Sequence, residues 1–193
     1  MNGSPKDVAS MTEKEWVALI VDYLRPRLAD KCDAKIGYRL PYSLEIVRYS
    51  DEVAITQPIA YQTDILITEE DDNGWLPRIV IEAKIGNVTT HDAITYSQKA
   101  ANHKSVHPYL RYGIILGAWK DSALPGRLFR HGAHFDFMFA FAGTEPSEVE
   151  GERFVSLIKN EIGSSRTLER ITFDSRKRGR EKYNLFQRRL ILE

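Results

Sequence analysis

Apolar residues recur at helical spacing near the beginning of the chain. Their intervals of three, four and seven residues predict an amphipathic helix that faces a core; the residues are Trp16, Val17, Ile20, Val21, Leu24 and Leu28. One possible start pairs Ser10 with Glu13, and the other pairs Thr12 with Glu15. Both pairs have the spacing of a capping box. Pro26 is expected to kink or thin the last turn of this helix.

The next part of the chain predicts strands. Four stretches are apolar or alternate between apolar and polar residues, at positions 34–40, 43–49, 60–68 and 78–85. Pro41 separates the first two, and we expect a loop through Gln57-Pro58 before the third. An acidic run between the last two ends in Asn73-Gly74, a pair favoured in tight reversals. The last two strands are therefore expected to form an antiparallel hairpin.

The second half of the chain alternates helices with apolar strands. A helix is expected from Thr89 or Thr90 to about Ser105, with Ile94 and Ala101 on its apolar side. The remaining expected segments are a buried strand at 112–119, a loop at 120–134, a strand at 135–142, a helix at 147–162, and possible short strands at 170–173 and 184–192. This order predicts an α/β fold, with helices packed around one mixed central sheet.

Composition places this fold in an ordinary globular protein. The length of 193 residues suits one domain, 1–193, with a core at about 10–145 and a basic C-terminal part at about 164–193. Cys32 is the only cysteine, so the chain forms no internal disulfide, and a reducing, cytoplasmic compartment is expected. The polar N-terminus lacks the apolar core of a signal peptide, and no apolar run is long enough for a membrane helix.

Charge is balanced in total but unevenly distributed. Residues 50–75 contain seven acidic and no basic residues, whereas residues 164–193 contain nine basic and four acidic ones. An acidic middle and a basic tail are compatible with a cation site beside a phosphate-binding surface. Two solvated faces of opposite sign would produce the same pattern.

Glu82 and Lys84 interrupt an apolar strand. Side chains alternate along a strand, so these two share a face and lie about 6–7 Å apart. Three successive apolar residues precede Glu82, which suggests a central strand covered on both faces. Ionised side chains are rare in such strands unless they have a function. The expected hairpin can bring Asp64 opposite Glu82. The competing interpretation is an exposed, ion-paired patch on an edge strand.

Two carboxylates that converge near a lysine suit a hard divalent cation, here one or two Mg²⁺ ions. Such an ion can polarise a phosphate and lower the pKa of an attacking water. Lys84 could orient or deprotonate that water, or stabilise charge that develops on the phosphate. The sequence therefore indicates phosphodiester hydrolysis at Asp64, Glu82 and Lys84.

Asp64 followed by Glu82-Ala83-Lys84, after a helix with a glutamate near its start, resembles the PD-(D/E)xK nuclease superfamily. This group includes restriction endonucleases, Holliday-junction resolvases and repair exonucleases. The resemblance covers about the first 120 residues, as an α-β-β-β-α-β order, and it implies a restriction-endonuclease-like sandwich. Thr63 stands where the motif has its proline.

The resemblance also implies two further site residues. The carbonyl of Ala83 would be a metal ligand beside Asp64 and Glu82. An acidic residue on the first helix would complete the site, and Glu13 is the better candidate because it lies over the core-facing stripe. Glu15 is the alternative, with helix capping as its competing role.

Several polar and basic residues are candidate DNA contacts. They are Gln98, Lys99, Arg127, Arg130, Arg176, Lys177, Arg178 and Arg180. Gln98 and Lys99 follow the motif strand on the next helix, where many members of the superfamily carry a polar residue that supports the site. The others would contact phosphates. For each of them a solvated surface is the alternative.

These features favour a Mg²⁺-dependent endonuclease that acts on double-stranded DNA. A type II restriction endonuclease is the first hypothesis, because the chain is small and carries no helicase or ATPase part. The alternative is a structure-specific resolvase or a DNA-repair nuclease of the same fold. From another class, the alternative is a non-cleaving DNA-binding module. One such site cuts one strand at a time, so a homodimer is expected.

Overall fold

Five strands form the central sheet, in the spatial order β1-β4-β5-β6-β7. The computed structural model describes residues 11–120, 123–174, 177–187 and 190–192. The strands are β1 (Cys32–Ile36), β4 (Ile65–Asp71), β5 (Gly74–Ile85), β6 (Arg111–Gly117) and β7 (Phe137–Ala140). β4 runs antiparallel to β1 and β5, whereas β6 runs parallel to β5 and β7. The predicted α/β class and mixed sheet are confirmed.

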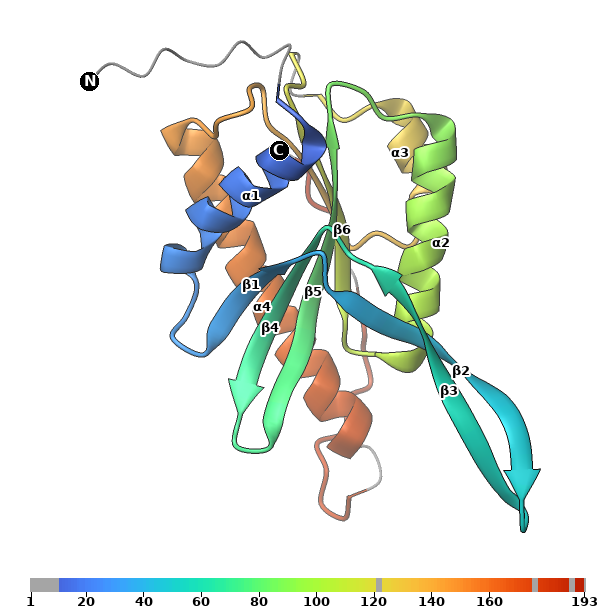
Figure 1. Ribbon diagram of the computed structural model, residues 1–193. Helices are drawn as coiled ribbons and strands as arrows, with labels where there is room; N and C mark the ends of the chain where they lie inside the picture. Colours follow the sequence, from blue (N-terminus) through green and yellow to red (C-terminus); the bar gives the residue numbers. More distant parts are fainter. Residues whose placement is uncertain (1–10, 121–122, 175–176, 188–189, 193) are drawn as a thin grey trace.

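Helices cover both faces of this sheet (Figure 1). α1 (Glu13–Leu24) and α4 (Glu148–Asp174) pack on one face, and α2 (Thr90–Val106) and α3 (Gly126–His131) pack on the other. The apolar stripe of α1 is buried as predicted from Trp16 to Leu24, whereas Leu28 lies beyond the helix and is half-buried. Thr12 and Glu15 form its capping box, and Pro26 lies in a 3₁₀ turn that follows it. Ser10 lies outside the described residues.

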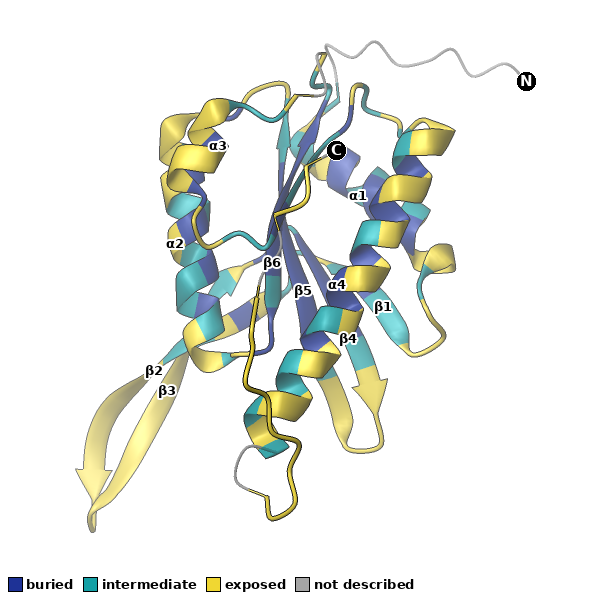
Figure 2. Cartoon of the chain, turned by 180° about the vertical axis from the view of Figure 1, so that it is seen from behind, coloured by how far each residue is buried: buried dark blue, intermediate teal, exposed yellow. Residues whose placement is uncertain are grey.

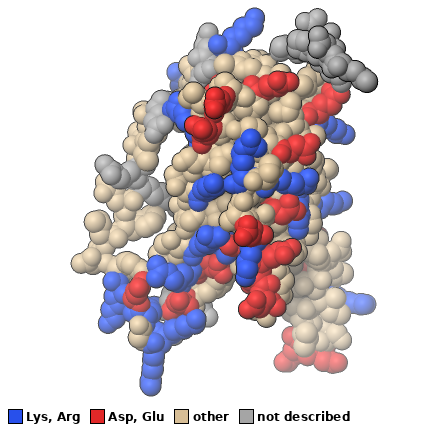
Figure 3. All heavy atoms as spheres, turned by 90° about the vertical axis from the view of Figure 1, so that its left-hand side faces the viewer, with Lys and Arg blue, Asp and Glu red and all other residues tan. Residues whose placement is uncertain are grey.

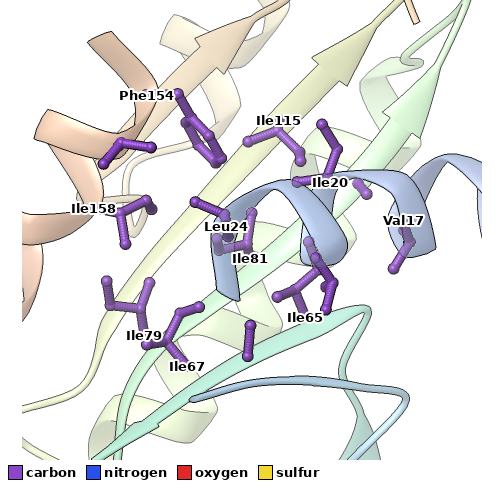
Figure 4. Packing of buried hydrophobic residues seen from close by; sticks show 14 of the residues in the cluster. Val17, Ile20, Leu24, Ile65, Ile67, Ile79, Ile81, Ile115, Phe154 and Ile158 are labelled. Carbon is purple, nitrogen blue, oxygen red and sulfur yellow. The ribbon is translucent and has the colours of Figure 1, made fainter. Parts of the chain in front are cut away.

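β5 is a central strand with both faces covered. Its residues Ile79 and Ile81 are fully buried against α1 and α4 (Figure 4). Val80 points to the other face, where it packs in a second cluster with Leu40 and Tyr112. The prediction of a doubly covered strand is confirmed, and the interpretation of its polar residues as an exposed edge-strand patch is wrong.

A two-stranded hairpin projects from this body (Figure 1). β2 (Arg39–Ser50) pairs antiparallel with β3 (Val53–Gln62), apart from the central sheet. Pro41 was expected to separate two strands and Gln57-Pro58 to form a loop, but all three residues lie inside these strands. Proline is tolerated there because both strands are edges and a register shift occurs beside Pro41.

Other boundaries also differ from the expectations. Residues 60–68 form two strands, because the chain leaves β3 after Gln62 and enters β4 only at Ile65. The expected loop at 120–134 contains α3. α4 continues to Asp174, so the short strand expected at 170–173 is wrong. Residues 184–187 and 190–192 form no strand.

The buried side of α2 also differs from the prediction. Its buried residues are Ala93, Ser97, Ala100 and His103, whereas Ile94 is 50% exposed. The buried side of α2 therefore consists mainly of small residues, and the apolar Ile94 lies outside it. Among the described residues, no helix is both long and apolar enough to cross a membrane.

The burial pattern predicts unequal effects of two isoleucine truncations. Ile81→Ala should lower the free energy of unfolding by about 2–5 kcal/mol, because it opens a cavity in the centre of the sheet. Ile94→Ala removes the same atoms from an exposed position and should change it by less than about 0.5 kcal/mol. Urea denaturation of both variants checks this, and equal losses would contradict the assignment of the two faces.

Candidate functional site

A break between two strands positions Asp64. The Thr63 backbone N–H and Oγ1 both donate to the Tyr38 carbonyl, at 2.9 and 3.0 Å. The Asp64 carbonyl accepts a hydrogen bond from the Gly37 N–H at 3.2 Å. The side chain of Asp64 turns toward β5, where its Oδ2 accepts from the Ala83 N–H at 2.8 Å. Asp64 therefore lies just beyond the β4–β5 ladder, which ends at the pair Ile65–Ile81.

Glu82 is a buried carboxyl group next to Asp64. It is only 1% exposed, and its Oε1 accepts a hydrogen bond from the Tyr112 hydroxyl at 2.5 Å. The Lys99 Nζ lies 3.6 Å from the same oxygen. Burial, and then the negative charge of Asp64, raise the pKa of Glu82 to about 7, although Lys99 and Tyr112 oppose this. The Glu82 carboxyl is therefore partly protonated near neutral pH.

Lys84 lies beside the N-terminus of α1. Its Nζ forms an ion pair with Glu13 Oε2 at 3.2 Å, and it lies 5.3 Å from the centre of the Tyr96 ring. Burial favours neutral lysine, but the contacts with Tyr96 and Glu13 outweigh it and raise the pKa of Lys84 above its ordinary value. Lys84 is therefore a cation. Glu13, rather than the capping Glu15, is the glutamate of α1 that reaches this place.

The backbone of Ala83 faces Asp64. Its N–H bonds to Asp64, and the N–H and C=O of one strand residue point toward the same neighbouring strand. The Ala83 carbonyl is therefore also directed toward Asp64. The donors available to a metal are the carboxylates of Asp64 and Glu82 and this carbonyl, a hard oxygen set of the kind Mg²⁺ prefers. In the arrangement of the described residues, no three His, Cys, Asp or Glu side chains are gathered closely enough to hold an ion.

The candidate DNA contacts are dispersed. Lys99 is the one that reaches the carboxyl pair, whereas its exposed neighbour Gln98 bonds to Asn102. Arg127 donates to the Val88 carbonyl at 2.9 Å. The remaining candidates come later in the sequence. Arg130, Arg178 and Arg180 are exposed, and Lys177 pairs with Asp174. Arg176 is outside the described residues. On the face shown in Figure 3, basic and acidic side chains are interspersed.

Aromatic residues that the sequence analysis did not single out surround the carboxyl pair. Tyr112 holds Glu82 from β6, and Tyr96 contacts Lys84 and Lys99 from α2. The Lys99 Nζ also lies 5.7 Å from the centre of the Tyr61 ring on β3. The sequence offered one signal for this contact: Tyr112 lies in a largely aliphatic strand, and a buried tyrosine hydroxyl needs a hydrogen-bond partner.

No protein-family model matches this chain, and no curated protein matches it significantly in sequence. The interpretation of the site therefore depends on its own residues and geometry.

The burial of Glu82 predicts a variant that is more stable than the original. Because the folded-state pKa is about 7 instead of the usual 4.5, ionisation of Glu82 destabilises the fold progressively as pH rises between these two values. Glu82→Gln stays neutral, so it should raise the free energy of unfolding at pH 8 by about 2–3 kcal/mol and change it little at pH 4.

Urea denaturation of this variant at both pH values provides the measurement. The control is Glu45→Gln, at an exposed position of β2, which should leave the pH dependence unchanged. A Glu82→Gln protein that is no more stable at pH 8 would show that Glu82 ionises without cost.

Proposed function

We propose that this protein is a Mg²⁺-dependent DNA endonuclease, with a type II restriction endonuclease as the first hypothesis. The observation that carries the proposal is the convergence of Asp64 and Glu82 at the end of the β4–β5 ladder, with cationic Lys84 beside them. Glu82 is placed in a buried central strand with Asp64 beside it, at an energetic cost that a purely structural role does not explain. The order of α1, the antiparallel strands, α2 and the parallel β6 also agrees with the resemblance to PD-(D/E)xK nucleases.

The donor set fits magnesium. Asp64 and Glu82 would hold the ion with their carboxylates and Ala83 with its carbonyl, and the proton that Glu82 partly retains near neutral pH would leave as the ion binds. Magnesium bound there would polarise a phosphate and lower the pKa of an attacking water. Tyr112 and Lys99 restrict the orientation of the Glu82 carboxyl, and such supporting contacts commonly determine metal affinity.

Lys84 acts as a cation in this proposal. Its raised pKa disfavours a role as the base that deprotonates water near neutral pH. It is suited instead to orient the water and to stabilise negative charge on the phosphate in the transition state. Hydrolysis adds water across one P–O bond: the water oxygen bonds to phosphorus, and the leaving oxygen takes a proton. The products are a phosphate monoester and a hydroxyl.

DNA is the proposed substrate because charges suited to phosphates lie around the carboxyl pair. Lys84 and Lys99 flank it within the body of the protein, and the exposed Arg178 and Arg180 add positive charge beyond α4. One site can cut one strand at a time. Cleavage of both strands of a duplex therefore favours a homodimer with twofold symmetry.

Incubation with supercoiled plasmid and phage DNA, with Mg²⁺ or with EDTA, tests the proposed function on a gel. Discrete fragments that require Mg²⁺ support a restriction endonuclease, and a smear supports non-specific cleavage. DNA that is bound but left intact under all conditions would contradict the proposal and favour a binding module.

Loss of either carboxylate should abolish cleavage. Asp64→Asn and Glu82→Gln each remove an anionic magnesium ligand, and each should lower the rate by at least about 100-fold while the fold is retained. Glu70→Gln, at an exposed position of β4, is the matched control and should cleave normally. Rates on supercoiled plasmid, with circular dichroism as the check on folding, provide the measurement. Wild-type rates from either site variant would refute the metal assignment.

Lys84→Ala should separate chemistry from binding. The variant should lose turnover but keep its affinity for DNA in Ca²⁺, because Lys84 is assigned to the transition state. Fluorescence anisotropy gives the affinity, and single-turnover cleavage in Mg²⁺ gives the rate. A variant that binds tenfold more weakly yet cleaves normally at saturation would assign Lys84 to binding instead.

A further inference from the structure

The hairpin of β2 and β3 exposes apolar side chains that the rest of the described structure does not cover. Its residues beyond the root are coloured exposed in Figure 2. Leu44, Ile46 and Tyr49 are 63%, 54% and 66% exposed. A two-stranded hairpin is only marginally stable in water by itself, so a projecting arm of this kind gains stability from a partner.

These side chains share one face of the hairpin. Leu44 is paired with Pro58, Ile46 with Thr56, and Tyr49 with Ala54. Directly opposite residues point to the same side, and the even-numbered positions of β3 share that side throughout. We call this side the apolar face; its residues are Arg39, Pro41, Leu44, Ile46, Tyr49, Ala54, Thr56, Pro58, Ala60 and Gln62.

The opposite face packs on α2 at the root of the hairpin. Tyr61 receives a hydrogen bond from Asn102 and contacts the His103 ring, and the Leu40 side chain is buried with Ala100. Farther out this second face is mixed in polarity, with Glu45 and Arg48 among its residues. The apolar face therefore points away from α2, and no described residue outside the hairpin covers Leu44, Ile46 or Tyr49.

Charge is distributed unequally along the hairpin. The tip carries Asp51 and Glu52, both with positive φ, 49° and 67°. Asparagine and glycine are favoured in that conformation, so an acidic pair is kept there at some backbone cost. At the other end of the apolar face lies Arg39, exposed and without an ion pair to any described residue. One end of the apolar face is thus acidic and the other is basic.

We propose that the apolar face packs on the same face of a second copy of this chain, antiparallel about a twofold axis. This arrangement brings Asp51 and Glu52 of each hairpin to Arg39 of the other, so the face is complementary to itself in charge and in polarity. DNA is a poorer occupant, because an acidic tip repels phosphates. The proposal specifies the surface for the dimer expected under the proposed function.

The size of the face predicts a weak dimer. A hairpin about 40 Å long and two strands wide offers roughly 400 Å² per copy, or about 800 Å² in total, which is below the standard size and in the range of weak, transient interfaces. Assembly of the free protein is therefore expected at concentrations on the order of micromolar. Two half-sites on one duplex would strengthen it further.

Sedimentation velocity of the full chain without DNA, over about 1–100 µM, tests the proposal. The wild type should shift from monomer to dimer across this range. The triple variant Leu44→Ser, Ile46→Ser, Tyr49→Ser should raise the dissociation constant at least tenfold. The matched control is Val53→Ser with Ile55→Ser, two exposed apolar residues on the opposite face, which should dimerise as the wild type does.

Charge reversal gives a second test that leaves the apolar residues intact. Arg39→Glu should weaken the dimer, and the addition of Asp51→Arg and Glu52→Arg should restore it. A wild type that stays monomeric at every concentration would overturn the proposal, as would apolar-face variants that lose DNA affinity with no change in mass. Because mass is measured without DNA, a protein that dimerises but cleaves nothing would contradict only the nuclease proposal.

Discussion

The desolvation of Glu82 beside Asp64 is the constraint on which the site depends. A carboxyl group that is 1% exposed in the middle strand of a five-stranded sheet is tolerated only if it stays protonated or finds positive charge. Tyr112 donates a hydrogen bond to one oxygen, and Lys99 places a cation near it. These contacts reduce the cost of burial without removing it, as the raised pKa shows. A divalent cation would remove it, because both carboxylates would then be ionised against a matching charge.

The chain creates this carboxyl pair by interrupting a strand. If β3 continued into β4, the backbone at Asp64 would be an ordinary part of a ladder. Instead, Thr63 donates hydrogen bonds to the Tyr38 carbonyl. The Asp64 carboxylate accepts the Ala83 N–H, which a backbone carbonyl would accept if the ladder continued. The same break allows β2 and β3 to leave the sheet as a separate hairpin. One local departure from regular structure thus explains both the site and the projecting arm.

The sequence was sufficient to predict that four side chains would come together. Alternation along residues 78–85 placed Glu82 and Lys84 on one face, the Asn73-Gly74 turn placed Asp64 opposite Glu82, and helical spacing placed Glu13 over the core. The first two inferences use local geometry, and the contacts between Asp64 and β5 agree with them. An acidic residue on the first helix was implied by the resemblance, and helical spacing only selected Glu13, which pairs with Lys84. The role of Tyr112 was missed because it depends on the pairing of β5 with β6, which α2 separates in sequence.

The hairpin was missed for a different reason. Its strands contain Pro41 and Pro58, and much of their apolar surface faces outward, so the pattern that normally indicates a core was misleading. α4 was predicted too short because its last turns extend past the sheet and carry few buried residues. In both places, parts of the chain extend away from the core. The spacing of apolar residues reveals a helix or strand through the side that it buries in the core. It is less accurate for segments that do not pack on a core.

The root of the hairpin is connected to the carboxyl pair by continuous contacts. The His103 Nε2 lies 3.1 Å from the Leu40 carbonyl, its ring stacks on Tyr112, and Tyr112 bonds to Glu82. Burial lowers the pKa of His103 to about 4, so the ring is neutral at physiological pH, and Nε2 is the nitrogen that donates to Leu40. A charged ring would add a cation near Lys99 and weaken that packing. The neutral histidine therefore links the root of the hairpin to the tyrosine that binds Glu82.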